Sequence, residues 1–244
     1  METDWNALAQ EYHLRGMPPT DAFGFAKVLS LVGNLKGKLV LDYGCGTGKF
    51  SKILARETGS VIGIDSSEVM VKMAWRNNTS DFFLPLHTDS LMPLHTNLLM
   101  KTAAFDVAVS TFVYCTIPSQ EELARVTQQI YSSLKPRGTF TLLDPHPDSL
   151  EHHFTSFYRR RPDNLFSGCP IEVKLEGLKE PIIDYWRSKE DYVEILTKEG
   201  FFIEKISEPV LNDVPSQLYF LENAVLLGEE TKYPPYIIIH ARKP

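Results

Sequence analysis

Three glycines at alternate positions, Gly44, Gly46 and Gly48, follow an apolar segment at residues 39–43. Glycines directly after a buried strand let the backbone turn sharply, and they let a ligand approach main-chain atoms that a Cβ would shield. The next apolar segment ends in Asp65, whose carboxylate can accept hydrogen bonds from both hydroxyls of a ribose. The glycine spacing differs from that of dinucleotide sites, which place a pyrophosphate at a helix N-terminus. These residues therefore predict a site for a nucleoside whose tail carries no phosphate.

Alternating strand and helix patterns from residue 38 to residue 144 must position these groups, and they predict a parallel sheet with helices on both faces. We expect strands near residues 38–43, 60–65, 82–87, 104–110 and 138–144. We expect helices near residues 47–58, 66–77 and 119–134, with N-caps at Thr47, Ser66 and Ser119. Ser188 and Asp191 form a capping-box pattern, which predicts a further helix.

At these residues the chain resembles the class I S-adenosylmethionine-dependent methyltransferases. The resemblance covers nearly the whole chain and rests on residues 42–48, Asp65, Thr88-Asp89-Ser90, residues 105–110, residues 134–139, which are similar to the family's "LKPGG" turn, and residues 199–201. It implies a doubly wound, Rossmann-like α/β fold. The implied sheet has seven strands, mostly parallel, with an antiparallel last strand at residues 236–241. It also implies S-adenosylmethionine as the cofactor and S-adenosylhomocysteine as the product.

The resemblance assigns the cofactor site residue by residue. Gly44 and Gly46 would approach the methionine moiety, Asp42 would lie beneath its ammonium group, and Asp65 would hold the ribose. Asp89 would accept from the adenine amine; the alternative is that it caps a helix or turn. Tyr12 would reach the methionine carboxylate, or would only dock an N-terminal amphipathic helix on the sheet. The expected cofactor set is Tyr12, Asp42, Gly44, Gly46, Asp65, Ser66, Met70, Asp89, Ser90 and Ser110.

About 57 residues separate Asp144 from Phe201, at the expected sixth strand, far more than the dozen or so that a crossover needs. We therefore expect residues 146–187 to be an insertion at the ligand-binding edge of the sheet, acting as an acceptor lid. Phe154 and Phe157 add aromatic surface to it. The expected acceptor contacts are Phe112, Tyr114, His146, Tyr158, Tyr185 and Trp186. His146 is the candidate general base, because its usual pKa lies near 6.5; the alternative is an ordinary loop histidine.

Composition limits the acceptor. The 244 residues carry a net charge of −6, which argues against a nucleic-acid substrate. The arginine run at residues 159–161 could bind an anionic acceptor; the alternative is a solvent-exposed helix end. The three cysteines show no metal-ligand spacing, so we expect no metal and a reducing cytoplasm. No apolar run of about 18 residues predicts a membrane segment, and no N-terminal pattern predicts targeting.

We interpret the chain as one domain, residues 1–244, with an N-terminal helical cap at residues 1–30, present as a monomer or homodimer. The expected activity is methyl transfer to oxygen or nitrogen of a small aromatic or heteroaromatic molecule. Residues 110–114 lack the Asn/Asp-Pro-Pro-Tyr pattern that aligns planar nitrogens in some nucleic-acid and protein methyltransferases. One alternative is a tRNA or protein methyltransferase. Another is a non-catalytic protein that binds S-adenosylmethionine, since no base is unambiguous.

Overall fold

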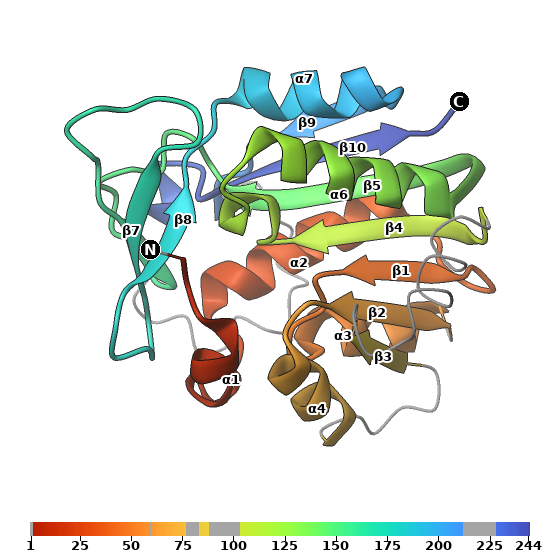
Figure 1. Ribbon diagram of the computed structural model, residues 1–244, viewed down its shortest axis with the longest axis horizontal. Coiled ribbons are helices and arrows are strands. Elements are labelled where there is room, and N and C mark those ends of the chain that lie inside the picture. The colour runs from red at the N-terminus through yellow and green to blue at the C-terminus, as the bar shows by residue number, and fades with distance from the viewer. Residues whose placement is uncertain (1, 59, 77–82, 88–102, 212–227) are drawn as a thin grey trace.

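The computed structural model describes residues 2–58, 60–76, 83–87, 103–211 and 228–244. Within these residues, seven strands form one sheet in the order β3-β2-β1-β4-β5-β10-β9 (Figure 1). The strands are β1 (Val40–Tyr43), β2 (Val61–Asp65), β3 (Phe83–His87), β4 (Phe105–Thr111), β5 (Leu134–Pro145), β9 (Phe202–Ser207) and β10 (Tyr236–Arg242). β10 runs antiparallel to β5 and β9, and the other pairs are parallel. The doubly wound sheet with an antiparallel last strand is confirmed.

The order of the strands reverses beside β1, which pairs with β2 on one side and with β4 on the other. Tyr43 lies opposite both Ile64 and Ser110, so the carboxyl ends of all three strands meet at one edge. Chains leaving such a switch point diverge to opposite faces and open a crevice. The glycine loop and Asp65 lie at this crevice because they directly follow β1 and end β2.

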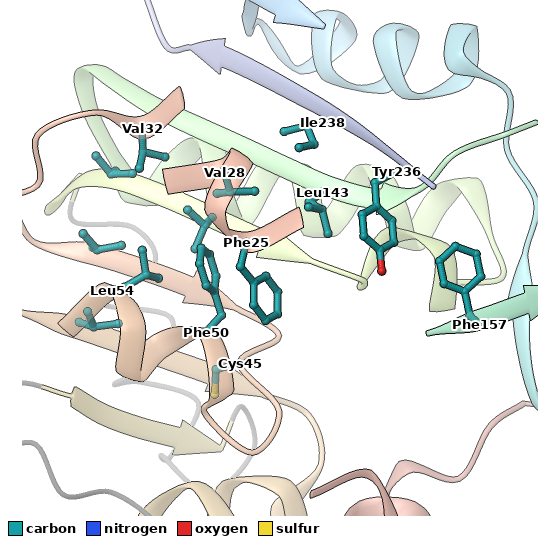
Figure 2. Packing of buried hydrophobic residues seen from close by; sticks show 14 of the residues in the cluster. Phe25, Val28, Val32, Cys45, Phe50, Leu54, Leu143, Phe157, Tyr236 and Ile238 are labelled. Carbon is teal, nitrogen blue, oxygen red and sulfur yellow. The ribbon is translucent and has the colours of Figure 1, made fainter. Parts of the chain in front are cut away.

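Helices cover both faces of the sheet, since parallel strands buried on two sides need apolar cover on each. One face carries α2 (Pro19–Val32), α3 (Lys49–Thr58) and α4 (Glu68–Arg76), and the other carries α6 (Gln120–Ser133) and α7 (Lys189–Glu199). Along β4 the side chains alternate: Val107 and Val109 pack toward α2 and α3, and Ala108 packs toward α6. Figure 2 shows the buried apolar residues on the face covered by α2 and α3, which form one cluster from Leu54 to Phe157.

Two of the four predicted helix caps are confirmed. Ser119 accepts from the amide of Glu122 at 3.1 Å, and Ser188 and Asp191 form the expected capping box. Ser66 does not cap α4. Asp65 accepts the amide of Ser67 and turns that next serine inward, so Ser67 Oγ accepts from the Met70 amide at 3.1 Å. Thr47 Oγ1 has no hydrogen-bond partner within the described chain, so its predicted capping role is wrong as well.

The predicted insertion contains a separate antiparallel sheet of β6 (Phe157–Arg159), β7 (Pro170–Leu175) and β8 (Ile182–Tyr185), in that order. We call it the small sheet. In Figure 1, β7 and β8 lie beyond the edge toward which β1, β4 and β5 point, near α1 (Trp5–Leu14). The described residues also contain two short 3-10 helices, η1 (Tyr114–Thr116) and η4 (Glu229–Thr231). Among the residues described, no helix is long and apolar enough to cross a membrane.

Candidate functional site

A cavity of about 660 Å³ lies at the switch point of the sheet. Volumes of this order are typical of sites for cofactors and small molecules. One wall comes from the glycine loop, the end of β2 and α1, and a second from the end of β4 and η1. A third comes from the small sheet, and α6 adds Glu122, Arg125, Val126 and Gln129. The cavity lining also includes Trp5, Tyr12, Gly44, Gly46, Asp65, Ser66, Met70, Thr111, Phe112, Cys115, Phe157, Val173, Leu175, Ile182, Asp184 and Tyr236. The predicted cofactor loop and the predicted insertion therefore share one space.

The glycine loop needs its glycines for two different reasons. Gly44 and Gly46 have φ of 78° and 53°, a backbone region that favours glycine. A Cβ on Gly44 would lie 2.2 Å from Cγ2 of Val113, so packing excludes a side chain there. A Cβ on Gly46 would have only Tyr12 Cε1 nearby, at 4.0 Å, and would enter the cavity. Gly46 thus exposes its backbone to any ligand in the cavity.

Asp65 fixes the loop and faces the cavity at the same time. Its Oδ2 accepts from the Gly46 amide and its Oδ1 from the Ser67 amide, both at 2.8 Å. Burial raises the pKa of Asp65, and these two hydrogen bonds oppose the rise. Each carboxylate oxygen can accept a second hydrogen bond. Asp65 is therefore able to hold two vicinal hydroxyls without releasing the loop, as a ribose site requires.

Asp42 lies buried at the end of β1 and does not line the cavity. Ser51 Oγ donates to its Oδ2, and its Oδ1 has no partner within the described residues. Burial raises the pKa of Asp42 to about 7, against the hydrogen bond from Ser51. An unpartnered buried acceptor beneath the loop fits the predicted role, in which Asp42 acts on an ammonium group through the backbone or water. Direct contact with a ligand is not available to it.

Tyr12 lies over the glycine loop as part of the cavity wall. Trp5 packs edge-on against its ring with centroids 5.7 Å apart, and Lys49 Nζ lies 4.0 Å from the ring centre. Lys49 also donates to the Tyr12 carbonyl at 2.6 Å, which ties α1 to the first turn of α3. These contacts dock α1 against α3, and Tyr12 also forms the wall on this side of the cavity. Its contact with a methionine carboxylate stays a prediction.

Ser66 and Met70 line the cavity as expected, whereas Ser110 does not. Ser110 is fully buried on the face of β4 that Ala108 shares, and its Oγ has no partner in the described part of the chain. Because side chains alternate along a strand, Thr111 takes the place at the cavity instead. Asp89 and Ser90 lie outside the described residues, so the predicted adenine contacts are untested.

Phe112 lines the cavity, and Tyr114 does not. Phe112 has φ of 60°, unusual for a non-glycine residue, and its ring lies 5.1 Å from that of Tyr236. Tyr114 is fully buried on the other face, and its hydroxyl lies 2.9 Å from Thr127 Oγ1 of α6. The prediction that Tyr114 forms an acceptor wall is wrong, because the turn at η1 points its ring into the core.

His146 is not placed to act as a base. Its Nε2 lies 3.1 Å from Glu208 Oε1, and its Nδ1 accepts from the Asp148 amide at 3.1 Å. The side chain is buried and does not line the cavity, although the preceding Pro145 does. Both ring nitrogens are occupied by protein groups. The alternative interpretation, a loop histidine with its hydrogen bonds satisfied, is the one that the structure supports.

In β6 the aromatic residue that enters the cavity is Phe157, not Tyr158. Tyr158 points the opposite way, donates to Glu151 Oε2 at 2.9 Å and stacks on His153. The same alternation buries Arg159, which donates to the His146 carbonyl at 3.0 Å and to Ser149 Oγ at 2.9 Å. The arginine run is therefore not one basic patch, and it does not grip a ligand in the cavity.

Two more residues expected to contact the acceptor, one in β8 and one directly after it, do not line the cavity. Ile182 and Asp184 line the cavity, whereas Tyr185 and Trp186 do not. The Trp186 indole donates to the Pro147 carbonyl at 3.0 Å and so fastens the small sheet to the loop after β5. The acceptor roles predicted for these two aromatic residues are wrong, because Tyr185 alternates with Asp184 along β8 and the hydrogen bond to Pro147 holds Trp186 outside the cavity lining.

A buried ion pair that no local sequence pattern indicated joins the cap to the small sheet. Arg15 Nη1 lies 2.6 Å from Asp21 Oδ2, and Tyr236 donates to Asp21 Oδ1 at 2.9 Å. Arg15 also donates to the carbonyls of Glu176, at 2.9 Å, and Ser156, at 3.2 Å. These partners come from four separate parts of the chain. Arg15 therefore holds the small sheet against α1 and α2 at the wall of the cavity.

We expect Arg15→Met to lower the free energy of unfolding by about 3 to 5 kcal/mol, because it leaves the Asp21 charge buried without its partner. The two side chains are 3% and 7% exposed. Urea denaturation of both proteins gives the difference. Arg125→Met is the control: its side chain is 59% exposed beside Glu122, and such pairs contribute about 1 kcal/mol at most. An equal, small loss in both variants would contradict the structural role of Arg15.

Residues 34–200 match a protein family described as a methyltransferase domain. The chain is 25% identical to N-demethylindolmycin N-methyltransferase of Streptomyces griseus over 240 residues, covering 91% of this chain and 98% of the relative. A Listeria monocytogenes structure described as a putative S-adenosylmethionine-dependent methyltransferase is 23% identical, with a TM-score of 0.64 over 92% of this chain and 99% of that chain. A structure of Synechocystis magnesium protoporphyrin IX methyltransferase with bound S-adenosylmethionine is 20% identical. Its TM-score is 0.55 over 92% of this chain and 80% of that chain.

Proposed function

Because the chain belongs to the methyltransferase domain family, and within it to the class I enzymes that use S-adenosylmethionine, we propose that it methylates a nitrogen or oxygen atom of a small aromatic or heteroaromatic molecule. The bound cofactor supplies an electrophilic methyl group on a sulfonium. The glycine loop, Asp65 and Tyr12 hold the cofactor at one end of the cavity. The small sheet supplies the wall opposite them.

The single cavity shared by the glycine loop and the small sheet is the observation that carries this proposal. Its acceptor side is mostly apolar and aromatic, with Phe112, Phe157 and Tyr236 packed ring against ring. Val173, Leu175 and Ile182 extend this surface. Such a wall excludes water and suits a flat molecule more than a charged polymer. The Streptomyces griseus relative is named as an N-methyltransferase, which favours nitrogen as the acceptor atom.

The test is a survey of acceptors with purified protein. The chain is incubated with S-adenosylmethionine and indoles, benzimidazoles, pyridones and phenols, and in parallel with bulk tRNA and with protein. S-adenosylhomocysteine and the methylated product are followed by mass spectrometry. We expect turnover with at least one heteroaromatic class and none with tRNA or protein. Methylation of the polymers alone would replace the proposal with the macromolecular alternative, and binding without any turnover would favour the non-catalytic one.

Phe157→Leu is expected to raise the acceptor's KM by about tenfold, because a changed apolar contact in a pocket is worth about 1 to 3 kcal/mol. The dissociation constant of S-adenosylhomocysteine should stay within about twofold, since the ring lies on the small-sheet side. Steady-state kinetics and calorimetry measure the two quantities. Tyr158→Ala is the matched control, because this neighbour faces away from the cavity. Equal effects of both substitutions on KM would remove the small sheet from the acceptor site.

A further inference from the structure

Asp184 is a buried carboxylate in the wall that the small sheet contributes. It lies on β8 opposite Ile171 of β7, lines the cavity, and is 3% exposed. Its Oδ1 has no hydrogen-bond partner within the described residues. Asp21, which also lines the cavity, already binds Arg15 and Tyr236. Glu122, another carboxylate of the lining, lies on α6 and pairs with Arg125. Asp184 is thus the buried carboxylate of the small-sheet wall with an oxygen left to receive a donor.

The groups around Asp184 come from three other elements. The Arg159 guanidinium of β6 attracts the charge of Asp184, the side chain of Cys115 of η1 also lowers the Asp184 pKa, and the charge of Asp184 raises the pKa of Asp144 of β5. Arg187, which follows β8, and Tyr192 of α7 both lower the pKa of Asp144, and the Tyr192 hydroxyl donates to its Oδ2 at 3.0 Å. Burial raises the pKa of Asp184 to about 6, while Arg159 and Cys115 hold it below the value that burial alone would give.

This combination suits a proton acceptor at neutral pH. A carboxyl group with a pKa of about 6 is ionised at pH 7, and it is far more basic than an exposed aspartate. A buried acceptor without a partner costs free energy unless a ligand donates to it. Cys115 does not compete for the role, because burial raises the pKa of its thiol well above the usual value.

We propose that Asp184 binds the N–H or O–H group of the methyl acceptor and takes its proton. This inference rests on the proposed function. As the acceptor's nitrogen or oxygen forms its bond to the methyl carbon, the carbon–sulfur bond breaks and the sulfonium becomes a neutral thioether. The proton of the N–H or O–H moves to Oδ1 of Asp184, and solvent receives it after the product leaves. The acceptor is therefore expected to carry a hydrogen on the atom that is methylated.

The first test measures binding rather than turnover. The protein saturated with S-adenosylhomocysteine is titrated in a calorimeter with indole, benzimidazole and phenol, and with the matched probes 1-methylindole, 1-methylbenzimidazole and anisole. We expect at least one unmethylated probe to bind about tenfold more tightly than its methylated partner, the value of one charge-assisted hydrogen bond. In Asp184→Asn that preference should fall toward one, with S-adenosylhomocysteine affinity unchanged. No preference in the wild-type protein would overturn the proposal.

The second test is a pH profile of kcat/KM for the acceptor found in the survey, at saturating S-adenosylmethionine. The wild-type value should fall tenfold per pH unit below about pH 6, because protonated Asp184 cannot accept a proton. Asp184→Asn should lose this acidic limb and about 100-fold or more in kcat. An Asp184→Asn enzyme with normal kcat and the wild-type limb would overturn the proposal, while the survey itself would still stand.

Asp144→Asn is the matched control. Asp144 is equally buried, its pKa is raised to about 7 by burial, and its Oδ1 also has no partner in the described chain, yet it does not line the cavity. We expect this variant to keep the acidic limb and the preference for the unmethylated probe. Loss of both in Asp144→Asn as well would reduce Asp184 to a member of a structural charge network. If Asp184→Asn fails to fold, the wild-type probe pairs still decide whether a hydrogen-bond acceptor is present.

Discussion

Gly46→Val is expected to weaken S-adenosylmethionine binding by about 100-fold or more, a loss of about 2.7 kcal/mol. The glycine has φ of 53°, and a side chain built on it would enter the cavity, with only Tyr12 within 4.0 Å. The added methyl groups would therefore occupy the space that the cofactor needs, and they would also strain the loop. Titration calorimetry with S-adenosylmethionine and with S-adenosylhomocysteine measures the loss.

Gly37→Val separates blockade of the cavity from backbone strain. Gly37 has a comparable positive φ of 75°, and nothing lies within 4 Å of the Cβ that a substitution would add. Both variants should lose about 1 to 2 kcal/mol of folding free energy from the left-handed backbone. Only Gly46→Val should lose the cofactor. Normal binding by a folded Gly46→Val protein would mean that the loop is a plain turn and would contradict the assigned site.

The place of the glycine loop and Asp65 at the cavity could be predicted from the sequence because its determinants are local. Gly44, Gly46 and Asp65 each follow or end a strand whose apolar pattern is continuous, and the ends of parallel strands meet at one edge. The capping box at Ser188 is likewise fixed by residues three apart. The resemblance to a known family then supplied the seven-stranded sheet and the antiparallel β10, which local patterns alone do not determine.

The acceptor side could not be predicted residue by residue, because it depends on the register of short strands. A shift of one position exchanges the faces of a strand. Phe157 and Asp184 line the cavity, whereas Tyr158 and Tyr185, their immediate neighbours, do not. The aromatic composition of the insertion was informative, but the pairing of β6, β7 and β8 decides which residues enter the cavity.

Long-range contacts account for the remaining differences between the site predicted from the sequence and the site in the structure. His146 meets Glu208, which is 62 positions away, and Arg15 meets backbone carbonyls of Ser156 and Glu176. No periodicity within a window of the sequence reports such pairings. Asp184 carried no motif either. Asp184 becomes a candidate only because the fold buries it in the cavity wall and leaves its Oδ1 without a partner in the described residues.

Asp65→Ala is expected to weaken cofactor binding by about 1.5 to 3 kcal/mol, the contribution of hydrogen bonds to a charged group, with the fold retained. Asp65 lines the cavity, and its oxygens can accept from two ribose hydroxyls. The same oxygens also hold the amides of Gly46 and Ser67, at 2.8 Å each. A loss of affinity alone would therefore not distinguish direct ribose contact from a loosened loop, so the measurement has to vary the ligand as well as the protein.

A thermodynamic cycle makes that distinction. The wild-type protein and Asp65→Ala are each titrated with S-adenosylhomocysteine and with its 2′,3′-dideoxy analogue. If Asp65 binds the ribose, removing the hydroxyls should weaken binding to the wild-type protein and have little further effect on the variant, because the partner is already gone. If Asp65 only holds the loop through Gly46 and Ser67, the two losses should add. Additive losses would withdraw the ribose assignment while leaving the cavity and the glycine loop as the cofactor site.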